Sequence, residues 1–309
     1  MQIEKDAIAL TKHSNLSVYS VLGGIDYQKQ KDYVRGKVID ILVATPGRLL
    51  DLIDQRHISL RDVEYLVLDE ADRMLDMGFI HDIRRVLKVL PTKRQNLLFS
   101  ATMPPSIVEL ASGKDYADFM QERLFDPLGM ENTTFWPNLD HLDVLAKPYS
   151  KDKESGALVE AKNTRFSTPL HDPKRTPFPA GGLYSCARDL GQLYQMLLND
   201  GELDGKRFLK AATLKQMTAN QLGDLPNVSF APGMRMGLGF HIVGEPQEVT
   251  EHLSPGAFGH GGAFGTQAWI DPVKKRAYVL LIQRTDLKNS DQSDIRREFQ
   301  KAASEAYAR

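Results

Sequence analysis

The chain has 309 residues, of which 42% are hydrophobic and 26% are charged, and its formal net charge is −1. This length suits about two domains of the usual ~100–200 residues, and the near-zero net charge excludes a chain-wide electrostatic attraction to nucleic acid. The single cysteine, Cys186, excludes an intramolecular disulfide and a metal site built from cysteine spacing.

The N-terminal residues carry no targeting signal. They read MQIEKDAIALTKH, which is charged and lacks the apolar segment of a signal peptide. No apolar run in the sequence approaches the ~18 residues that span a membrane. We therefore expect a cytoplasmic protein without a membrane partner.

Residues 1–110 alternate between strand-like apolar runs and helix-like amphipathic runs. The expected strands lie at 17–24, 40–45, 63–70 and 95–102, and the expected helices at 46–55 and 80–90. This alternation predicts an α/β region, a parallel sheet covered by helices. In such sheets the chemistry sits at the carboxyl ends of the strands, and the polar motifs of this region fall at those ends.

Residues 114–309 follow a different pattern, which predicts an α+β region. Helical periodicity occurs at 115–125, 186–199, 211–218 and 292–307, and strand-like runs at 236–243, 266–272 and 276–283. The last two strands are expected to form an antiparallel hairpin that turns at Asp271 and Pro272. A long stretch from 136 to 182 shows little periodicity.

The acidic run VLDEAD (67–72) ends an expected strand. Two carboxylates at a strand end can hold Mg²⁺ through water and orient a hydrolytic water near a phosphate, although an acidic helix start is the alternative reading. Three further runs strengthen the functional reading of this acidic run, because they occur in order along the chain: VLGG (21–24), ATPGRLLDL (44–52) and LFSATMP (98–104). Together they resemble the first core domain of a DEAD-box RNA helicase, which has an incomplete RecA-like parallel sheet here.

The resemblance implies a role for each matching residue. Asp69 would lie by the Mg²⁺ of ATP, Glu70 would position or activate the attacking water, and Asp72 would couple hydrolysis to RNA strand separation through Ser100 and Thr102. A further set would contact the RNA backbone, as suits glycines and an arginine at a helix start: Gly23, Gly24, Thr45, Pro46, Gly47 and Arg48.

The family also requires a phosphate-binding loop, G-x-x-x-x-G-K-[ST]. No such string occurs in the 309 residues, and the second core domain with its arginine finger is not recognisable. The resemblance implies Mg²⁺ and ATP as cofactors, but without this loop we expect neither ATP binding nor ATPase activity.

The second region carries its densest signal at FGHGGAFGTQAWIDP (258–272), and two further runs at 116–135 and 179–209 are equally characteristic. Together they resemble the C-terminal part of serine β-lactamase-like hydrolases: class C β-lactamases, penicillin-binding-protein relatives and the esterases derived from them. The resemblance runs from about Lys114 to about Arg284 and implies an incomplete antiparallel sheet with helices. It also implies a small ester or lactam substrate and no cofactor.

In that family the triplet His260-Gly261-Gly262 would correspond to the K-T-G element. That element lies on a sheet edge, lines the substrate pocket and borders the oxyanion hole; the histidine is the esterase-like variant. Without the family, His260 is equally well a histidine at a strand end.

The nucleophile of that family is the serine of S-x-x-K at a helix start, and a Y-x-N element supplies a second base. The sequence contains no Y-x-N, and its S-x-x-K string at Ser150–Lys153 lies in a charged loop downstream of the helix it should precede. We therefore reject Ser150 as the family nucleophile and expect no ester or lactam hydrolysis.

The two patterns meet at Ser112-Gly113, inside sequence that is helix-like on both sides, without a Pro- or Gly-rich linker. This predicts an abrupt fusion of a partial helicase domain (1–113) with a partial hydrolase domain (114–309), inactive as ATPase and as esterase. The alternatives are a weak RNA-binding module, a residual β-lactamase-like hydrolase, and a structural or interaction protein. Whether the chain is an enzyme stays open at this point.

Overall fold

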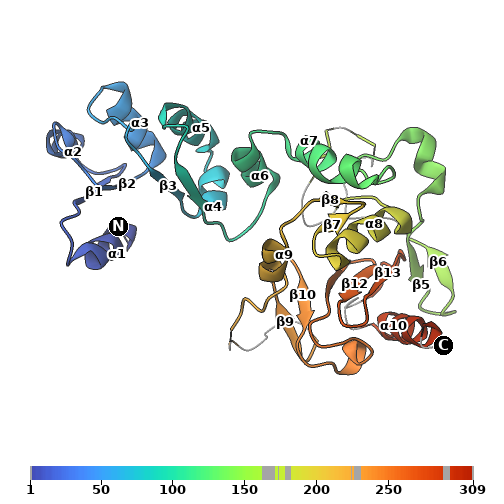
Figure 1. Cartoon of the computed structure of the whole chain (residues 1–309). Coiled ribbons are helices and arrows are strands. Elements are labelled where there is room, and N and C mark those ends of the chain that lie inside the picture. The colour runs from blue at the N-terminus through green and yellow to red at the C-terminus, as the bar shows by residue number, and fades with distance from the viewer. Residues whose placement is uncertain are drawn as a thin grey trace. The chain divides into compact units, whose positions relative to one another are not determined.

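A computed structural model gives the arrangement of the chain, which divides into two compact units, Met1–Tyr116 (unit 1) and Ala117–Arg309 (unit 2) (Figure 1). The structure describes residues 2–161, 171–172, 174–177, 182–223, 225, 231–287 and 293–307. Residues 179–181 of the second region's motifs, and residue 292 at the start of its last expected helix, therefore lie outside the described residues.

The strands of unit 1 pair in parallel, as the alternation predicts, but they form two separate two-stranded sheets in place of one sheet. The first joins β1 (Val18–Val21) to β2 (Ile41–Ala44), and the second joins β3 (Tyr65–Leu68) to β4 (Gln95–Leu98). A strand needs a hydrogen-bonded neighbour on each side to be central in a sheet. Each strand here has one such neighbour among the described residues.

Each strand of unit 1 is followed by a helix, and two further helices, α1 and α5, precede β1 and β4. Their first residues include a helix-starting proline in α3 and a capping carboxylate before α2, where Asp26 accepts from the amides of Gln28 and Lys29. The helices are α1 (Gln2–Thr11), α2 (Tyr27–Val34), α3 (Pro46–Asp54), α4 (Ala71–Asp76), α5 (Ile80–Val89) and α6 (Pro105–Ser112). Of these, the sequence analysis anticipated α3 and α5 alone.

Two small apolar cores hold unit 1 together, one for each sheet. The first centres on the buried residues Val21, Val34 and Leu52, and the second on Leu50 and its partners Val86 and Leu90. Helix α3 serves both cores because Leu50 and Leu52, two residues apart, lie on different sides of that helix, and Leu49 packs against both cores.

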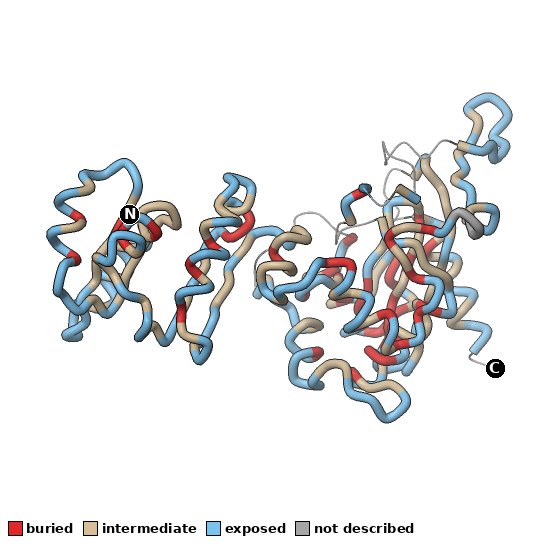
Figure 2. Tube along the Cα trace, turned by 90° about the horizontal axis from the view of Figure 1, so that it is seen from above, coloured by how far each residue is buried: buried red, intermediate tan, exposed pale blue. Residues whose placement is uncertain are grey.

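The opposite face of β3 remains uncovered. The side chains of Tyr65 and Val67 are 64% and 55% exposed, whereas Leu66, between them, packs into the second core. Alternate residues of a strand point to opposite faces, so one face of this sheet is packed and the other is bare. Buried positions are accordingly sparse along unit 1 (Figure 2).

The junction between the two sequence patterns has a helix on each side, as the helix-like sequence there predicts, and it lies at the end of the first of them. Helix α6 ends at Ser112, and Gly113 follows with φ of 72°, in the left-handed conformation that terminates helices and that glycine adopts without strain. A new helix, α7 (Tyr116–Met120), begins three residues later.

Unit 2 contains a five-stranded antiparallel sheet in the order β13-β12-β11-β10-β9. Its strands are β9 (Met234–Met236), β10 (His241–Val243), β11 (Phe258–Gly261), β12 (Gln267–Asp271) and β13 (Arg276–Leu280). The predicted hairpin after Asp271 is confirmed as β12–β13. The single strand expected at 236–243 is wrong: the chain turns there, with the Gly237 amide donating to the Phe240 carbonyl, and forms β9 and β10.

Helices and short hairpins surround this sheet. They comprise α7, the π-helical turn η1 (Gln121–Phe125), the 3-10 turns η2 (Asp126–Leu128), η3 (Leu139–Val144) and η4 (Glu248–Thr250), the helices α8 (Ala187–Leu198), α9 (Ala211–Met217) and α10 (Asp294–Ala306), and the hairpins β5–β6 (Tyr149–Lys151, Leu158–Glu160) and β7–β8 (Glu202–Leu203, Lys206–Arg207). Within the described part, no helix is long and apolar enough to cross a membrane.

The core of unit 2 is built on Trp269 of β12, which is fully buried. Val243 and Ala257, from other segments, are fully buried in the same cluster. The guanidinium of Arg296 on α10 lies 4.0 Å from the Trp269 ring centroid, and this arginine is 1% exposed. A planar cation stacked on an indole is a favourable contact, so α10 is fixed on the sheet by this pair.

Candidate functional site

The loops after β1 and β2 lie against each other at the carboxyl ends of these strands. The amide of Gly23 donates to the Thr45 hydroxyl at 3.0 Å, and Gly24 adopts a φ of 77°, which favours glycine. Parallel neighbours end at the same edge of a sheet. The structure thereby brings both glycines beside Thr45, the residue that precedes α3.

Pro46, Gly47 and Arg48 form the first turn of α3, whose free amides favour an anionic group. Arg48 is half-buried: its Nη1 donates to the Ile25 carbonyl at 3.0 Å, and its guanidinium lies 5.4 Å from the Tyr27 ring. Part of its hydrogen-bonding capacity therefore holds the loop after β1. The sequence analysis did not foresee Tyr27 in this role.

The acidic pair at the end of β3 is exposed. The Asp69 carboxylate accepts from the amide of Glu70 at 2.9 Å, and Glu70 adopts the left-handed region with φ of 47°. Arg73, one turn into α4, donates to the Glu70 carboxylate at 2.7 Å. The Glu70 carboxylate is therefore ion-paired. The spacing of three residues between glutamate and arginine could have indicated this pair.

Asp72 connects the strand ends of β3 and β4. Its carboxylate accepts from the Thr102 hydroxyl at 2.7 Å and from the Thr102 amide at 2.9 Å. Its own amide donates to the Ser100 hydroxyl at 3.2 Å, and that hydroxyl donates to the Thr102 carbonyl. The pKa of Asp72 lies below its usual value, and the hydrogen bond from the Thr102 hydroxyl contributes most to this lowering. The three predicted coupling residues thus lie in one network.

In unit 2, His260 and Gly261 lie on β11, opposite Ala268 and Gln267 of β12. β11 is the middle strand of five, whereas the resemblance implies a position at a sheet edge. The pairing of β11 with β10 ends at Gly259, so it does not include His260.

The His260 ring is exposed and stacked on His241, with ring centroids 4.4 Å apart. Its Nδ1 lies 2.6 Å from the Gly261 carbonyl oxygen. Because a carbonyl only accepts, Nδ1 carries the proton and Nε2 is the nitrogen that remains to accept. Gly262 begins a tight turn: a Cβ there would lie 1.9 Å from the Thr266 hydroxyl.

Ser150 lies on β5, opposite Val159 of β6, and not at a helix start. The hairpin is held by the segment that follows β13: the Tyr149 amide donates to the Gln283 carbonyl, and the Lys151 amide donates to Asp286 at 2.9 Å. A serine in an extended hairpin lacks the helix geometry that sets a lysine beside the hydroxyl in S-x-x-K.

The residues present do not fit a complete Mg²⁺–ATP site. Asp69 and Glu70 offer two exposed carboxylates, and one Glu70 oxygen accepts from Arg73 in a solvent-exposed ion pair. Across the described residues, no group of three or more His, Cys, Asp or Glu side chains is placed to hold a metal ion. The sequence supplies no G-x-x-x-x-G-K-[ST] loop for the phosphates.

Comparison with known families gives two matches. A beta-lactamase family model matches residues 106–303, and a DEAD/DEAH box helicase model matches residues 1–110. The two matched segments overlap at residues 106–110, within α6.

Comparison with individual proteins gives helicases. The chain is 43% identical over 154 residues to the ATP-dependent RNA helicase RhlB of Pseudomonas syringae, covering 45% of this chain and 39% of that protein. It is 52% identical over 113 residues to RhlB of Pseudomonas putida, covering 36% of this chain and 28% of that protein. The chain thus spans less than half the length of these curated relatives.

A solved structure also matches. The crystal structure of a hypothetical ATP-dependent RNA helicase from Sulfolobus tokodaii is 38% identical to this chain, with a TM-score of 0.34, over 36% of this chain and 33% of that one.

Proposed function

Since the chain belongs to the beta-lactamase family through residues 106–303 and carries a DEAD/DEAH box helicase segment before it, we propose that this fusion turns over neither ATP nor an ester or lactam. The domain boundary falls at Gly113, after α6. The helicase-like segment 1–113 keeps a weak affinity for RNA, and the hydrolase-like segment 114–309 keeps the framework of its family.

The observation that carries this proposal is that neither catalytic set is complete. Asp69 and Glu70 are exposed at the end of β3, but the sequence holds no G-x-x-x-x-G-K-[ST] loop that would bring the phosphates of ATP to them. Ser150 lies in a hairpin. The His260 ring contacts the Gly261 carbonyl and the His241 ring, and neither group is a nucleophile. General acid–base chemistry requires the base within hydrogen-bond reach of its target.

Two turnover assays test the absence of catalysis. We expect no RNA-stimulated release of phosphate from ATP, and no hydrolysis of a chromogenic cephalosporin or p-nitrophenyl acetate that Ser150→Ala or His260→Ala abolishes. Turnover of ATP that Glu70→Gln abolishes, or a covalent acyl adduct on a defined serine, would contradict the proposal.

RNA binding is the second function, and the assembled loops of unit 1 favour it. Gly23, Gly24 and Thr45 lie together at the start of α3, and Arg48 lies in its first turn. Glycines that let a backbone approach closely and amides at a helix start suit phosphate contacts. These contacts carry no base-specific hydrogen bond, so the expected affinity is weak and does not depend on RNA sequence.

Binding of a single-stranded RNA oligonucleotide at several salt concentrations tests this function. We expect log K to fall with log[salt], and Arg48→Gln to reduce that slope by about 1. Lys153→Gln, which removes an exposed cation from the hairpin of unit 2, serves as the control and should leave the slope unchanged. Equal slopes for the original chain and Arg48→Gln would exclude these loops as the RNA contact.

A further inference from the structure

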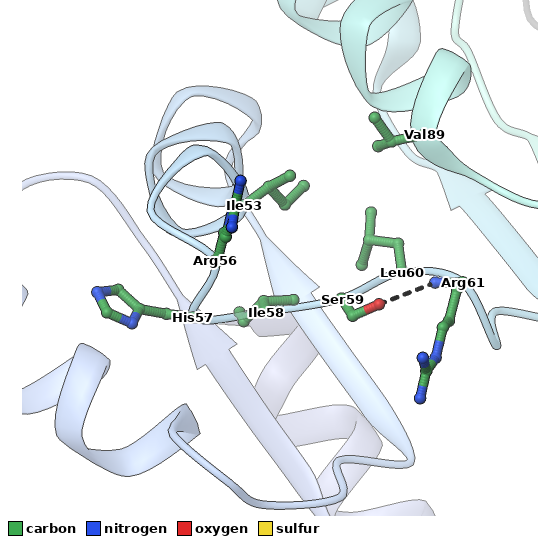
Figure 3. Close-up of a pocket in the computed structure, with 8 residues that line it drawn as sticks. All are labelled: Ile53, Arg56, His57, Ile58, Ser59, Leu60, Arg61 and Val89. Atoms are coloured by element: carbon green, nitrogen blue, oxygen red, sulfur yellow. Dashed lines mark hydrogen bonds between the residues drawn. The ribbon is translucent and has the colours of Figure 1, made fainter.

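A shallow groove of about 410 Å³ lies at the end of unit 1 where α3 and α5 end and β3 begins (Figure 3). The acidic and glycine motifs follow the strands, at their carboxyl ends. The groove therefore lies at the other end of β3 from Asp69 and is distinct from the site described above.

The floor of the groove is apolar. Figure 3 shows the side chains of Ile53 and Leu60 directed toward Val89, which projects from the last turn of α5. Val89 is 47% exposed, so a substantial part of this apolar surface is in contact with water. A single aliphatic or aromatic side chain of a partner would remove that area from water.

A cation lies at each end of this floor. The Arg56 guanidinium has no carboxylate within 4 Å among the residues that the structure describes. Arg61 pairs with the adjacent Asp62 at 3.3 Å, and both side chains are more than 80% exposed. A solvent-exposed pair of this kind contributes little, so both arginines are available to a carboxylate that arrives from outside.

Arg56 stands at a backbone position that ordinarily favours glycine. Its φ is 59°, and its amide donates to the Ile53 carbonyl at 2.8 Å just beyond the end of α3. A residue with a Cβ is strained in this left-handed conformation. Arginine therefore stabilises this helix end less than glycine would. Its side chain lies beside Ile53 at a conformational cost.

From this geometry we infer that the groove binds an acidic peptide segment of a partner protein, one that carries a leucine- or phenylalanine-type side chain between carboxylates. The apolar side chain would cover Val89 and Leu60, and the carboxylates would accept from Arg56 and Arg61. Charge complementarity of this kind selects an acidic partner.

RNA fits the groove less well. No phenylalanine, tyrosine or tryptophan is among the described residues that line it, and the small His57 ring is the one aromatic group there on which a base could stack. A phosphate would use the arginines but leave the apolar floor exposed to water. The peptide satisfies both parts of the surface.

Fluorescence anisotropy on the full chain tests the inference. The probe is a short labelled peptide in which acidic residues alternate with leucine, and the control probe carries glutamine at each acidic position. We expect binding of the acidic probe only. Arg56→Gly should weaken it about tenfold, the effect of losing one charge-assisted hydrogen bond, and Val89→Ala about fivefold through lost apolar contact.

The variants are chosen so that unfolding cannot explain a loss. Arg56→Gly relieves backbone strain, and Val89→Ala raises helix propensity, so neither should lower the melting temperature. Lys275→Gly is the matched control, because it removes a cation from a residue with φ of 52° in unit 2; the acidic probe should bind this variant normally.

Three results would overturn the inference. The first is equal binding of the glutamine probe, which would indicate apolar association alone. The second is unchanged binding of the acidic probe to Arg56→Gly. The third is an RNA oligonucleotide whose binding is lost in Arg56→Gly while the acidic peptide does not bind, which would assign the groove to nucleic acid.

Discussion

Asp72 shows how one carboxylate joins two segments that the sequence separates by about thirty residues. Its acceptor oxygen receives both the hydroxyl and the amide of Thr102, so it satisfies a backbone donor at the end of β4. The motif resemblance indicated that Asp72, Ser100 and Thr102 belong together, and the structure gives the hydrogen bonds. The ion pair between Arg73 and Glu70, which is exposed to solvent, was not anticipated.

Replacement of Asp72 tests this network. Asp72→Ala removes the acceptor for the Thr102 amide, and a polar group left without its partner destabilises the fold. We expect Asp72→Ala to lower the melting temperature of unit 1, measured by circular dichroism. Asp72→Asn should lower this temperature less, because its amide oxygen still accepts a hydrogen bond. An unchanged melting temperature in Asp72→Ala would show that water replaces the carboxylate without cost.

The β5 hairpin should detach at acid pH. The Arg284 guanidinium and then the Lys151 amide lower the pKa of Asp286 to about 2. The unfolded chain has an ordinary aspartate pKa of about 3.9. The ionised carboxylate therefore stabilises the hairpin fully above about pH 4, and this stabilisation is lost as pH falls toward 2.

The Lys151 amide reports this titration directly, because it donates to Asp286. Its chemical shift in a pH series of amide spectra should change with a midpoint near 2, and hydrogen exchange at Lys151 should accelerate below it. A midpoint near 4, or a shift that Asp286→Asn leaves intact, would contradict the assignment.

At the scale of elements, propensity and periodicity located most of the long helices of unit 2 and all four strands of unit 1. They missed α1, α2, α4 and α6, whose sequences carry weaker apolar periodicity. They also merged β9 and β10 into one strand, because the turn at Gly237–Phe240 carries the large apolar residues Leu238 and Phe240 and so continues the apolar run. Pairing partners depend on contacts distant in sequence, which local patterns do not encode.

Packing of β11 against β12 depends on the absence of a side chain at Gly259. A Cβ there would lie 2.2 Å from the Ala268 carbonyl oxygen and 2.8 Å from Trp269. Gly259→Ala must therefore separate two central strands, and we expect a loss of about 1–3 kcal/mol in the free energy of unfolding, measured by urea denaturation.

Gly191 provides the matched control for this substitution. It lies inside α8, and a Cβ there would meet nothing within 4 Å. Gly191→Ala should raise the free energy of unfolding by about 1 kcal/mol, since alanine favours a helix interior. Equal effects of the two substitutions would mean that Gly259 is not constrained by its neighbours.

For the whole molecule, the chain combines two units with separate cores and separate sheets. Unit 1 has two small cores and a bare face on β3, whereas unit 2 has a continuous five-stranded sheet around Trp269. Stability scales with the apolar area that a unit removes from water. We therefore expect unit 1 to be the less stable part.

Differential scanning calorimetry should resolve two transitions. Asp72→Ala should lower the first and leave the second unchanged, and Gly259→Ala should lower only the second. One sharp transition that both substitutions move equally would show that the units unfold cooperatively, contrary to this expectation.

The sequence by itself determined that segments of two different families follow each other in this chain, because short motifs in the right order identify a family without any knowledge of their contacts. It also determined the parallel character of the first region and the hairpin after Asp271. Only the tertiary structure decided that the strands of unit 1 form two sheets, that β11 is a middle strand, and that Glu70 is paired. These features depend on which distant segments meet in space, and that is decided by packing and hydrogen bonding across the whole unit.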